Sequence, residues 1–431
     1  MRGGDRILWG VATSAFQIEG SLDADGRGRS IWDAFASDDG ETGAVACDHY
    51  RRWRGDVDLL TELGVDAYRF SLAWPRILPD GGGRIEQRGI DHYSQLLDAL
   101  LERGIEPVVT LFHWDLPVAF DWRERDTAYR FAEYAQVCFD AFGDRVKWWL
   151  TINEPWIVGL LGFLLGLHAP GIEGDLRGEV TAFHHMLLGH GLATQAYDHS
   201  HNIGMAPNLF PHYPATEDDR DAAWGSDGYT NRWFLDPLYG KGYPDDMRER
   251  WEAHVGPLDF VQDGDLDVIA TPTEYLGINY YAPRVIESRP GDHPWPWRVI
   301  VPDEWPTTAG FTGGVASTEA GTPIAPHGLT DLLTRVHRDY GARIMITENG
   351  AVFPEPQHDD RRVAFLRDHI AALRDAQAQG VDVLGYMHWS FMDNFEWKLG
   401  YAQRFGLVHV DYETQARTIK DSGRAYRSLM E

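Results

Sequence analysis

The sequence predicts an α/β protein that folds as a (β/α)8 barrel, the TIM-barrel architecture. Short apolar runs recur along the whole chain, and each is followed by a longer stretch in which apolar residues repeat with the period of a helix. We expect strands at residues 7–12, 67–71, 107–111, 148–152, 203–207, 275–279, 343–347 and 383–387. Eight strand–helix units in succession predict a closed parallel barrel inside a ring of helices.

Between these runs, five stretches have a clear helical pattern. They are residues 90–103, 127–142, 180–199, 329–340 and 361–379. No Ser/Gly/Pro-rich linker and no charge run divides the chain, so residues 1–431 are expected to form a single catalytic domain with long active-site loops. Residues 281–322, rich in Pro, Gly and Trp, are longer than a structural connector needs to be. We expect them to form a wall of the functional site.

Composition excludes several classes of partner. The formal net charge of −27 argues against nucleic acids and anionic membranes, since both require a cationic surface. The apolar residues 160–167 are too few to span a bilayer. Only Cys47 and Cys138 are present, so we expect two buried thiols in a reducing compartment. Because the charged first residues lead directly into a strand, the protein is expected to be cytoplasmic.

Two carboxylates follow two of the predicted strands. The run at 343–347 ends at Glu348, before Asn-Gly, and the run at 148–152 ends at Asn153 and Glu154, before a proline. A parallel barrel carries its chemistry at the carboxyl ends of its strands. Two acids placed there suggest a proton donor and a nucleophile that face one substrate.

Every predicted strand is followed by a polar or aromatic group suited to a hydroxyl-rich ligand. Aromatic residues also make up 13 % of the chain, with 17 Trp, and aromatic rings stack on the apolar faces of sugars, although a large aromatic core would need the same residues. In chain order the groups at the strand ends are Gln17, Glu19, Arg69, His113, Trp114, Asn153, Asn208, Asn279, Tyr281, Trp389 and Glu396.

Six segments together resemble glycoside hydrolase family 1, the β-glucosidase family. They are residues 7–20 (ILWGVATSAFQIEG), 68–76 (YRFSLAWPR), 111–117 (LFHWDLP), 151–155 (TINEP), 346–350 (ITENG) and 393–397 (DNFEW). They run in order through the whole chain. The resemblance implies a (β/α)8 barrel and a retaining β-glycosidase, most of all a β-glucosidase that also accepts β-galactosides or β-fucosides. Its substrates would be small β-glycosides or short oligosaccharides, and no cofactor or metal is implied.

The resemblance also implies a role for each matching residue. Glu348 would be the nucleophile and Glu154 the acid/base. Arg69 and the Tyr281 hydroxyl would keep Glu348 ionised, whereas Glu154 follows an apolar strand without an evident cationic partner, so its pKa can lie higher. The remaining substrate-binding positions would be Gln17, His113, Trp114, Asn153, Asn279, Trp389, Glu396, Trp397 and Phe405.

Several alternatives remain open or are disfavoured by particular residues. A 6-phosphoglycosidase would have Ser in place of Glu396. A Schiff-base enzyme would need a lysine at a strand end, and a metallohydrolase would need clustered ligands that the histidines do not provide. A sugar-binding protein without activity would be expected to have lost Glu154 or Glu348. The apolar residues 159–167 fit either a hydrophobic leaving-group site or an ordinary helix contact. A leaving-group site that excludes water would also allow net transglycosylation. Whether the protein forms a homo-oligomer is not readable from the sequence.

Overall fold

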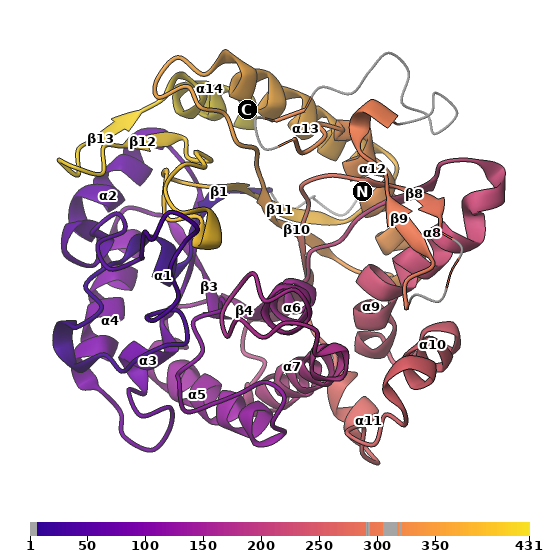
Figure 1. Ribbon diagram of the computed structural model, residues 1–431. Helices are drawn as coiled ribbons and strands as arrows, with labels where there is room; N and C mark the ends of the chain where they lie inside the picture. The colour runs from indigo at the N-terminus through magenta and orange to yellow at the C-terminus, as the bar shows by residue number, and fades with distance from the viewer. Residues whose placement is uncertain (1–6, 290, 292–293, 305–316, 319–320) are drawn as a thin grey trace.

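Parallel strands surround the centre of the molecule and helices cover the outside (Figure 1). The computed structural model describes residues 7–289, 291, 294–304, 317–318 and 321–431. Its central sheet has the strand order β5-β4-β3-β2-β1-β11-β10-β7. The bounds are β1 Leu8–Ala12, β2 Ala67–Ser71, β3 Glu106–Phe112, β4 Trp148–Asn153, β5 Asn202–Ala206, β7 Leu276–Asn279, β10 Ile344–Asn349 and β11 Val383–Trp389. The predicted (β/α)8 fold and its eight strands are confirmed.

The sheet closes into a barrel where β5 meets β7. The backbone N–H of Asn279 donates to the Pro207 carbonyl at 3.0 Å, and the N–H of Leu209 donates to the Asn279 carbonyl at 3.1 Å. At the other end of the seam, the N–H of Glu274 donates to the Ile203 carbonyl at 3.1 Å. These bonds satisfy backbone groups that an open sheet edge would leave unpaired.

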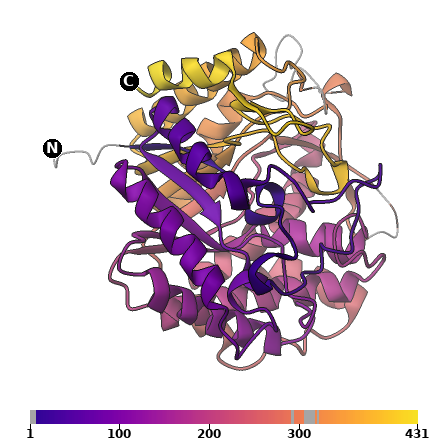
Figure 2. The ribbon, with the colours of Figure 1, turned by 90° about the vertical axis from the view of Figure 1, so that its left-hand side faces the viewer.

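Amphipathic helices pack along the outside of the strands, as the side view in Figure 2 also shows. In α4, for example, Leu96, Leu97 and Leu100 are buried against the barrel. The five predicted helices are confirmed, but α2, α8, α10 and α14 were not predicted. The longer helices are α2 His49–Leu63, α4 Gln87–Glu102, α5 Asp126–Phe142, α7 Leu176–Ala196, α8 Arg220–Asp227, α10 Asp245–Val255, α12 Pro326–Tyr340, α13 Asp360–Ala378 and α14 Asp421–Met430.

Short elements decorate the loops that follow the strands. The short α-helices are α1 Ala15–Ile18, α3 Trp74–Ile77, α6 Pro155–Gly159, α9 Trp233–Leu238 and α11 Asp265–Ile269. Strands β6 His212–Pro214, β8 Arg284–Ser288 and β9 Trp297–Val299 form one small sheet, and β12 Val408–Val410 pairs with β13 Arg417–Ile419. The sequence 281–322 was interpreted as a long loop, but β8 and β9 give part of it regular structure. Residues 305–316 of that segment lie outside the described residues.

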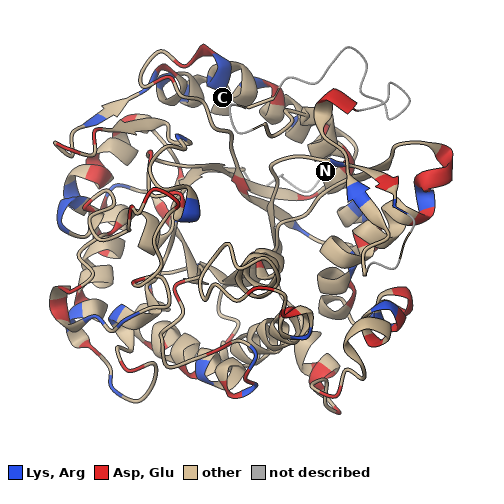
Figure 3. Ribbon diagram, viewed as in Figure 1, with Lys and Arg blue, Asp and Glu red and all other residues tan. Residues whose placement is uncertain are grey.

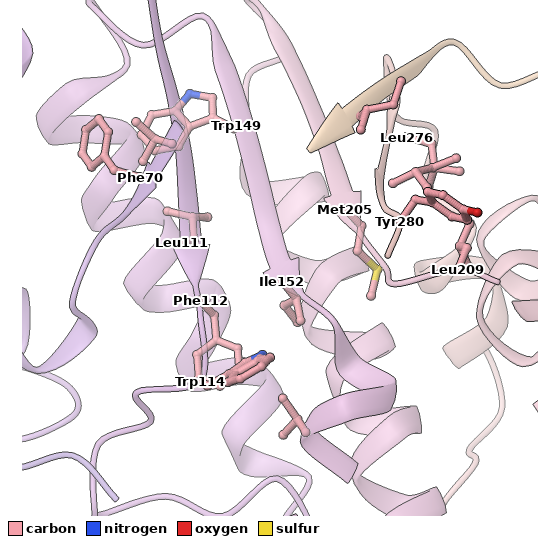
Figure 4. Close-up of a cluster of buried hydrophobic side chains, with 14 of the residues drawn as sticks. Phe70, Leu111, Phe112, Trp114, Trp149, Ile152, Met205, Leu209, Leu276 and Tyr280 are labelled. Atoms are coloured by element: carbon pink, nitrogen blue, oxygen red, sulfur yellow. The ribbon is translucent and has the colours of Figure 1, made fainter. Parts of the chain in front are cut away.

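Two apolar layers fill the molecule, one inside the barrel and one between the strands and the helices. Neighbouring residues alternate between them: Val108 faces the inner layer and Val109 the outer, and Leu150 faces the inner layer and Trp149 the outer. Figure 4 shows part of the outer layer, with Phe70, Leu111 and Trp149. Because both faces are buried, the strands are rich in apolar residues on both sides, which is the pattern that predicted them.

The alternation breaks in the two strands that lead to the candidate catalytic acids. The register of β4 against β5 shifts between Leu150 and Asn153, and the register of β10 against β7 shifts between Ile346 and Glu348. Such bulges change which side chain faces a given side of the sheet. They turn the last polar residues of β4 and β10 toward the barrel axis.

Charged residues lie mainly on the outer helices and the connecting segments (Figure 3). In the part of the chain that the structure describes, no helix is both long enough and apolar enough to cross a membrane. Cys47 and Cys138 are both buried and unpaired with each other, as predicted.

Candidate active site

A cavity of about 350 Å³ opens at the carboxyl ends of the barrel strands. The structure brings eleven of the sequence-predicted residues to its wall: Gln17, His113, Trp114, Glu154, Asn279, Tyr281, Glu348, Trp389, Glu396, Trp397 and Phe405. The two remaining predicted residues, Arg69 and Asn153, are fully buried next to this wall and hold its side chains in place. Residues scattered over almost the whole sequence are thus gathered at one end of the barrel.

Glu348, at the end of β10, is held by a cation and a hydroxyl. Arg69 Nη1 donates to Glu348 Oε1 at 2.6 Å, and the Tyr281 hydroxyl donates to Glu348 Oε2 at 2.6 Å. Arg69 is itself fixed by Thr110 Oγ1 at 3.1 Å and by the Thr347 carbonyl at 3.0 Å. Both contacts are short hydrogen bonds that hold the carboxylate in one orientation.

Glu154 has a different environment at the end of β4. It precedes α6, and its Oε1 accepts a hydrogen bond of 2.8 Å from Asn279 Nδ2. Burial, and then the charge of Glu348, raise the pKa of Glu154 well above its ordinary value. A carboxyl whose pKa is raised is suited to protonate a leaving group.

Amides and a guanidinium connect the two carboxyl groups. Asn153 Oδ1 accepts from Arg69 Nη2 at 2.7 Å and from Asn279 Nδ2 at 3.0 Å. Thr347 Oγ1 donates to Asn279 Oδ1 at 2.7 Å. Arg69 therefore contacts Glu348 directly and reaches Glu154 through Asn153 and Asn279. A displacement of any one of these side chains would disturb both acids.

Gln17 and Glu396 line another part of the cavity, which we call its polar floor. Gln17 Nε2 lies 3.0 Å from Asn394 Oδ1 and 3.3 Å from Glu396 Oε2, and Ser14 Oγ donates to Gln17 Oε1 at 2.6 Å. Burial, and then the charge of Glu348, raise the pKa of Glu396 to about 8. In the ligand-free cavity this carboxyl therefore carries a proton at neutral pH and can both donate to and accept from a sugar hydroxyl.

Aromatic rings line the cavity with parallel faces. The His113 ring lies 5.7 Å from Trp389 with an interplanar angle of 14°, and 6.2 Å from Trp397 with an angle of 10°. Burial, and then Arg69, lower the pKa of His113 well below its ordinary value, so the ring is neutral. Phe405 meets Tyr281 edge to face at 6.2 Å. The faces provide a stacking surface for the apolar side of a pyranose ring.

Three residues of the cavity have a backbone conformation that is rare outside glycine. The φ angle is 48° at Glu154, 80° at Trp114 and 53° at Trp397. Left-handed φ values at bulky residues are unfavourable and persist where surrounding contacts fix them, typically at functional sites. Trp114 is fixed in this way by the hydrogen bond from its Nε1 to the Asn153 carbonyl at 3.1 Å.

His388 lies outside the cavity, although it is adjacent to Trp389 in the chain. Its neighbour Trp389 lines the cavity, whereas His388 is fully buried on the other side of β11, 6.1 Å from the Tyr426 ring of α14. Successive residues of a strand point to opposite faces. His388 therefore belongs to the outer apolar layer.

Several wall residues were not in the set predicted from sequence. They are Trp156, Ile157, Leu161, His168, Asn208, Phe210, Arg284 and Leu399. Trp156 and Ile157 directly follow Glu154 and Pro155, so proximity to the acid was a usable signal. Asn208 had been noted at a strand end. Arg284 lies in the segment 281–322 that was expected to form a wall, on β8, which pairs with β6.

The apolar segment 159–167 combines both roles left open by the sequence. A π-helical turn, Leu160–Leu164, extends α6, and within it Phe163 is buried in the core. Leu161 lines the catalytic cavity, and Leu165 is 44 % exposed. One face of the turn is a packing contact, and the other is an apolar wall next to Glu154.

A barrel with two unlike carboxyl groups, a polar floor and stacked aromatic rings has the features of a glycosidase. Comparisons with known proteins agree. The model of glycosyl hydrolase family 1 matches residues 4–431. Beta-glucosidase A of Acetivibrio thermocellus is 40 % identical, with 98 % of this chain and 97 % of that protein covered. The bifunctional beta-D-glucosidase/beta-D-fucosidase of Bifidobacterium breve is 40 % identical with the same shares, 98 % and 97 %.

A solved structure gives the same result. The family 1 β-glucosidase from Thermotoga maritima superimposes with a TM-score of 0.92 at 40 % sequence identity, covering 100 % of this chain and 97 % of that chain. The chain therefore belongs to glycosyl hydrolase family 1, and its enzymatic class is that of a β-glucosidase.

Proposed function

We propose that Glu348 is the nucleophile and Glu154 the acid/base in a double displacement that releases terminal β-D-glucosyl residues with retention of configuration. The observation that carries the proposal is the unlike environment of the two carboxyls. Glu348 accepts from Arg69 and Tyr281, both at 2.6 Å. Glu154 accepts from the neutral amide of Asn279, and burial raises its pKa. One group is thus prepared to attack and the other to give up a proton.

In the first step the Glu348 carboxylate forms a bond to the anomeric carbon while the bond to the glycosidic oxygen breaks. Glu154 gives its proton to that oxygen, and the aglycone leaves as an alcohol. The resulting ester removes the negative charge from Glu348, so the pKa of Glu154 falls. Glu154 then takes a proton from water as the water attacks the anomeric carbon, which releases the sugar and restores both acids.

Recognition of the sugar would rest on the polar floor and the aromatic rings. Five residues would bind the hydroxyls of the sugar ring: Gln17, His113, Asn153, Glu396 and Trp397. Trp389 would stack under the ring. Trp114, Asn279, Tyr281 and Phe405 would complete the enclosure. Glu396 stands where a 6-phosphoglycosidase would have Ser, which favours neutral glucosides, galactosides and fucosides. The curated relative that acts on both glucosides and fucosides supports this range.

The setting of the enzyme is part of the same proposal. Two buried thiols that are not paired, Cys47 and Cys138, suit a reducing cytoplasm. The strands β1 and β11, from the two ends of the chain, pair side by side, which supports one catalytic domain over residues 1–431.

The roles of the two acids are tested by azide rescue of Glu348→Gly and Glu154→Ala with p-nitrophenyl β-D-glucoside. Without the Glu348 carboxylate, azide enters the vacant α face and should give α-glucosyl azide. In Glu154→Ala the ester still forms and azide attacks it, which should give β-glucosyl azide. The opposite pattern of products would reverse the assignment. Absence of hydrolysis by the unmodified enzyme would favour a sugar-binding protein without activity.

A further inference from the structure

A second cavity lies beside the catalytic one. Its volume is about 600 Å³, and its apolar wall is formed by Trp156, Leu160, Leu164, Leu165, Leu176 and Trp295. Trp156 and Arg284 line both cavities, so the two spaces meet at these two side chains. An apolar space of this size can hold a large part of an organic ligand.

The second cavity lies on the side where a leaving group must depart. Glu154 is the residue that precedes α6, and Trp156 lies in the first turn of that helix. An aglycone whose oxygen is protonated by Glu154 is therefore next to α6, where Ile157 and Leu161 line the catalytic cavity. From there, Trp156 leads into the second cavity. The apolar π-helical turn Leu160–Leu164 continues the same wall.

Arg284 is half-buried between the two cavities, and its surroundings differ from those of the buried arginines. Its guanidinium lies 4.6 Å from the Trp156 ring centroid and 4.0 Å from that of Phe210, so aromatic faces surround it. The buried guanidinium groups of Arg69, Arg76 and Arg362 have carboxylate partners, which are Glu348, Glu19 and Asp359. Among the described residues, no carboxylate forms an ion pair with Arg284. Burial lowers the pKa of Arg284 to about 10, which leaves it charged at neutral pH.

A desolvated cation without an anion is energetically unfavourable, and an anionic ligand group that reaches it forms a strong ion pair. A planar guanidinium suits a carboxylate in particular. The net charge of −27 would repel anions at long range. That repulsion is screened over about 8 Å at physiological ionic strength. The local charge at Arg284 therefore decides what binds beside it.

We propose that the two cavities form one substrate channel, and that its aglycone end accepts an apolar group carrying a carboxylate, which Arg284 binds. The inference rests on the proposed function, because it takes the second cavity as the place of the leaving group. It goes further by naming the class of substrate: β-glucosides of aromatic or alkyl acids.

The test compares two substrates that differ in one charge. They are the β-D-glucoside of 3-(4-hydroxyphenyl)propanoate and the glucoside of its methyl ester, and the quantity is the ratio of kcat/KM for acid over ester. We expect a ratio of about 10 or more in the unmodified enzyme, as one ion pair of about 1.4 kcal/mol provides. Arg284→Gln should lower the ratio to about 1 or below, and Arg284→Lys should keep part of it.

Arg298→Gln is the matched control. Arg298 lies on β9, is exposed and pairs with Glu287 and Glu304, so its loss changes the net charge equally without touching either cavity. The ratio should stay at its original value in this variant. A ratio at or below 1 in the unmodified enzyme, or the same ratio in the Gln variants of Arg284 and Arg298, would overturn the role of Arg284.

Two further measurements keep the proposal testable if Arg284→Gln does not fold. In the unmodified enzyme, free 3-(4-hydroxyphenyl)propanoate should inhibit at a lower concentration than its methyl ester, and equal inhibition contradicts the proposal.

Leu164→Trp should fill the second cavity and remove a preference for 4-hexylphenyl over phenyl β-D-glucoside. An undiminished preference refutes the channel. Hydrolysis of the ester glucoside with no preference for the acid refutes only this inference, whereas failure to hydrolyse any glucoside refutes the proposed function.

Discussion

The two sides of the cleft hold their side chains by different forces. The sugar end, which we define as Gln17, Arg69, Asn153, Glu348 and Glu396, is a network of hydrogen bonds on the ends of barrel strands. The apolar side, which we define as Trp156, Ile157, Leu160, Leu161 and Leu164, is a short helical segment that presents hydrocarbon and aromatic surface.

The difference shows where this protein needs a fixed geometry. Charges in a space from which water is excluded interact strongly. Small displacements at the sugar end should therefore change the pKa values of its carboxyl groups and also their reactivity. Apolar surface is non-directional, and its contribution depends mainly on the area that is buried. We therefore expect substitutions at the sugar end to have large effects and those on the apolar side to have small, substrate-dependent effects.

The largest effect is expected at Glu154, which lies between the two sides. Glu154→Gln should reduce kcat/KM on an alkyl β-glucoside by about 10²–10⁴-fold, because an alkoxide leaves poorly without a proton. Since burial raises the pKa of Glu154, activity of the unmodified enzyme should fall as pH rises through that pKa. Initial rates over a pH series would show this limb, and the variant should lack it.

Glu179 provides a control for that pH dependence. It is a second buried glutamate, on α7, whose pKa burial raises to about 8, and its partner is the Tyr229 hydroxyl. Glu179→Gln should leave the alkaline limb in place. If the limb disappears in this variant and persists in Glu154→Gln, Glu154 is not the proton donor.

Arg69→Met should have the largest effect on stability at the sugar end. The variant leaves the Glu348 charge buried without its cation and also removes the bond to Asn153, and breaking a buried pair in this way costs about 3–5 kcal/mol. Denaturant unfolding would measure the loss. Arg103→Met, which removes an ion pair to Asp58 on the surface, should cost less than about 1 kcal/mol. Similar losses in the two variants would mean that the network adds little.

Glu396→Gln should have opposite effects on activity and stability. The amide of Gln keeps a donor and an acceptor, but it cannot ionise and so cannot form a charged hydrogen bond with a sugar hydroxyl. We therefore expect a loss in kcat/KM of roughly 10²-fold. The folded pKa of about 8 lies above the ordinary value of 4.5, so the unmodified enzyme loses stability as pH rises from about 4.5 to about 8. Above pH 8 the variant should be more stable, by about 1–2 kcal/mol once the partial exposure of the carboxyl is considered.

Unfolding curves of the two proteins at pH 5 and pH 9 would measure that difference. The curves should differ less at pH 5 than at pH 9, because at pH 5 Glu396 is protonated in the folded protein and already partly ionised in the unfolded chain. A variant that is less stable at pH 9 would show that Glu396 makes a net favourable interaction in its charged form.

The smallest effect is expected at an exposed residue next to the apolar side. Leu165→Ser should change the free energy of unfolding by less than about 0.5 kcal/mol, because the side chain is already 44 % exposed. Phe163→Ser, in the same segment, removes a fully packed ring and should cost at least about 3 kcal/mol. Denaturation midpoints of the pair would show whether exposure alone separates their effects.

Much of the barrel could be predicted because its strands are buried on both faces. Runs such as 344–346 and 148–150 are apolar without interruption, and a polar residue marks the point where each strand reaches the cleft. The same signal marked Glu154 and Glu348 as candidate acids, whereas Trp397 and Phe405 were proposed from the family resemblance alone. Helix α2 was missed because its buried residues are separated by charged ones, and β8 and β9 were missed because they lie in a segment rich in Pro and Gly.

By itself the sequence determined the order of the strands, the two acids and the chemical character of the cleft, because these depend on local patterns of burial and polarity. The tertiary structure decided what those patterns cannot encode. It set the bulges that turn Glu154 and Glu348 inward, the hydrogen bonds that give these two carboxyls unlike environments, and the approach of Arg284 to Trp156. Each is a contact between residues far apart in the chain, and the energy of such a contact depends on a distance that only the folded barrel fixes.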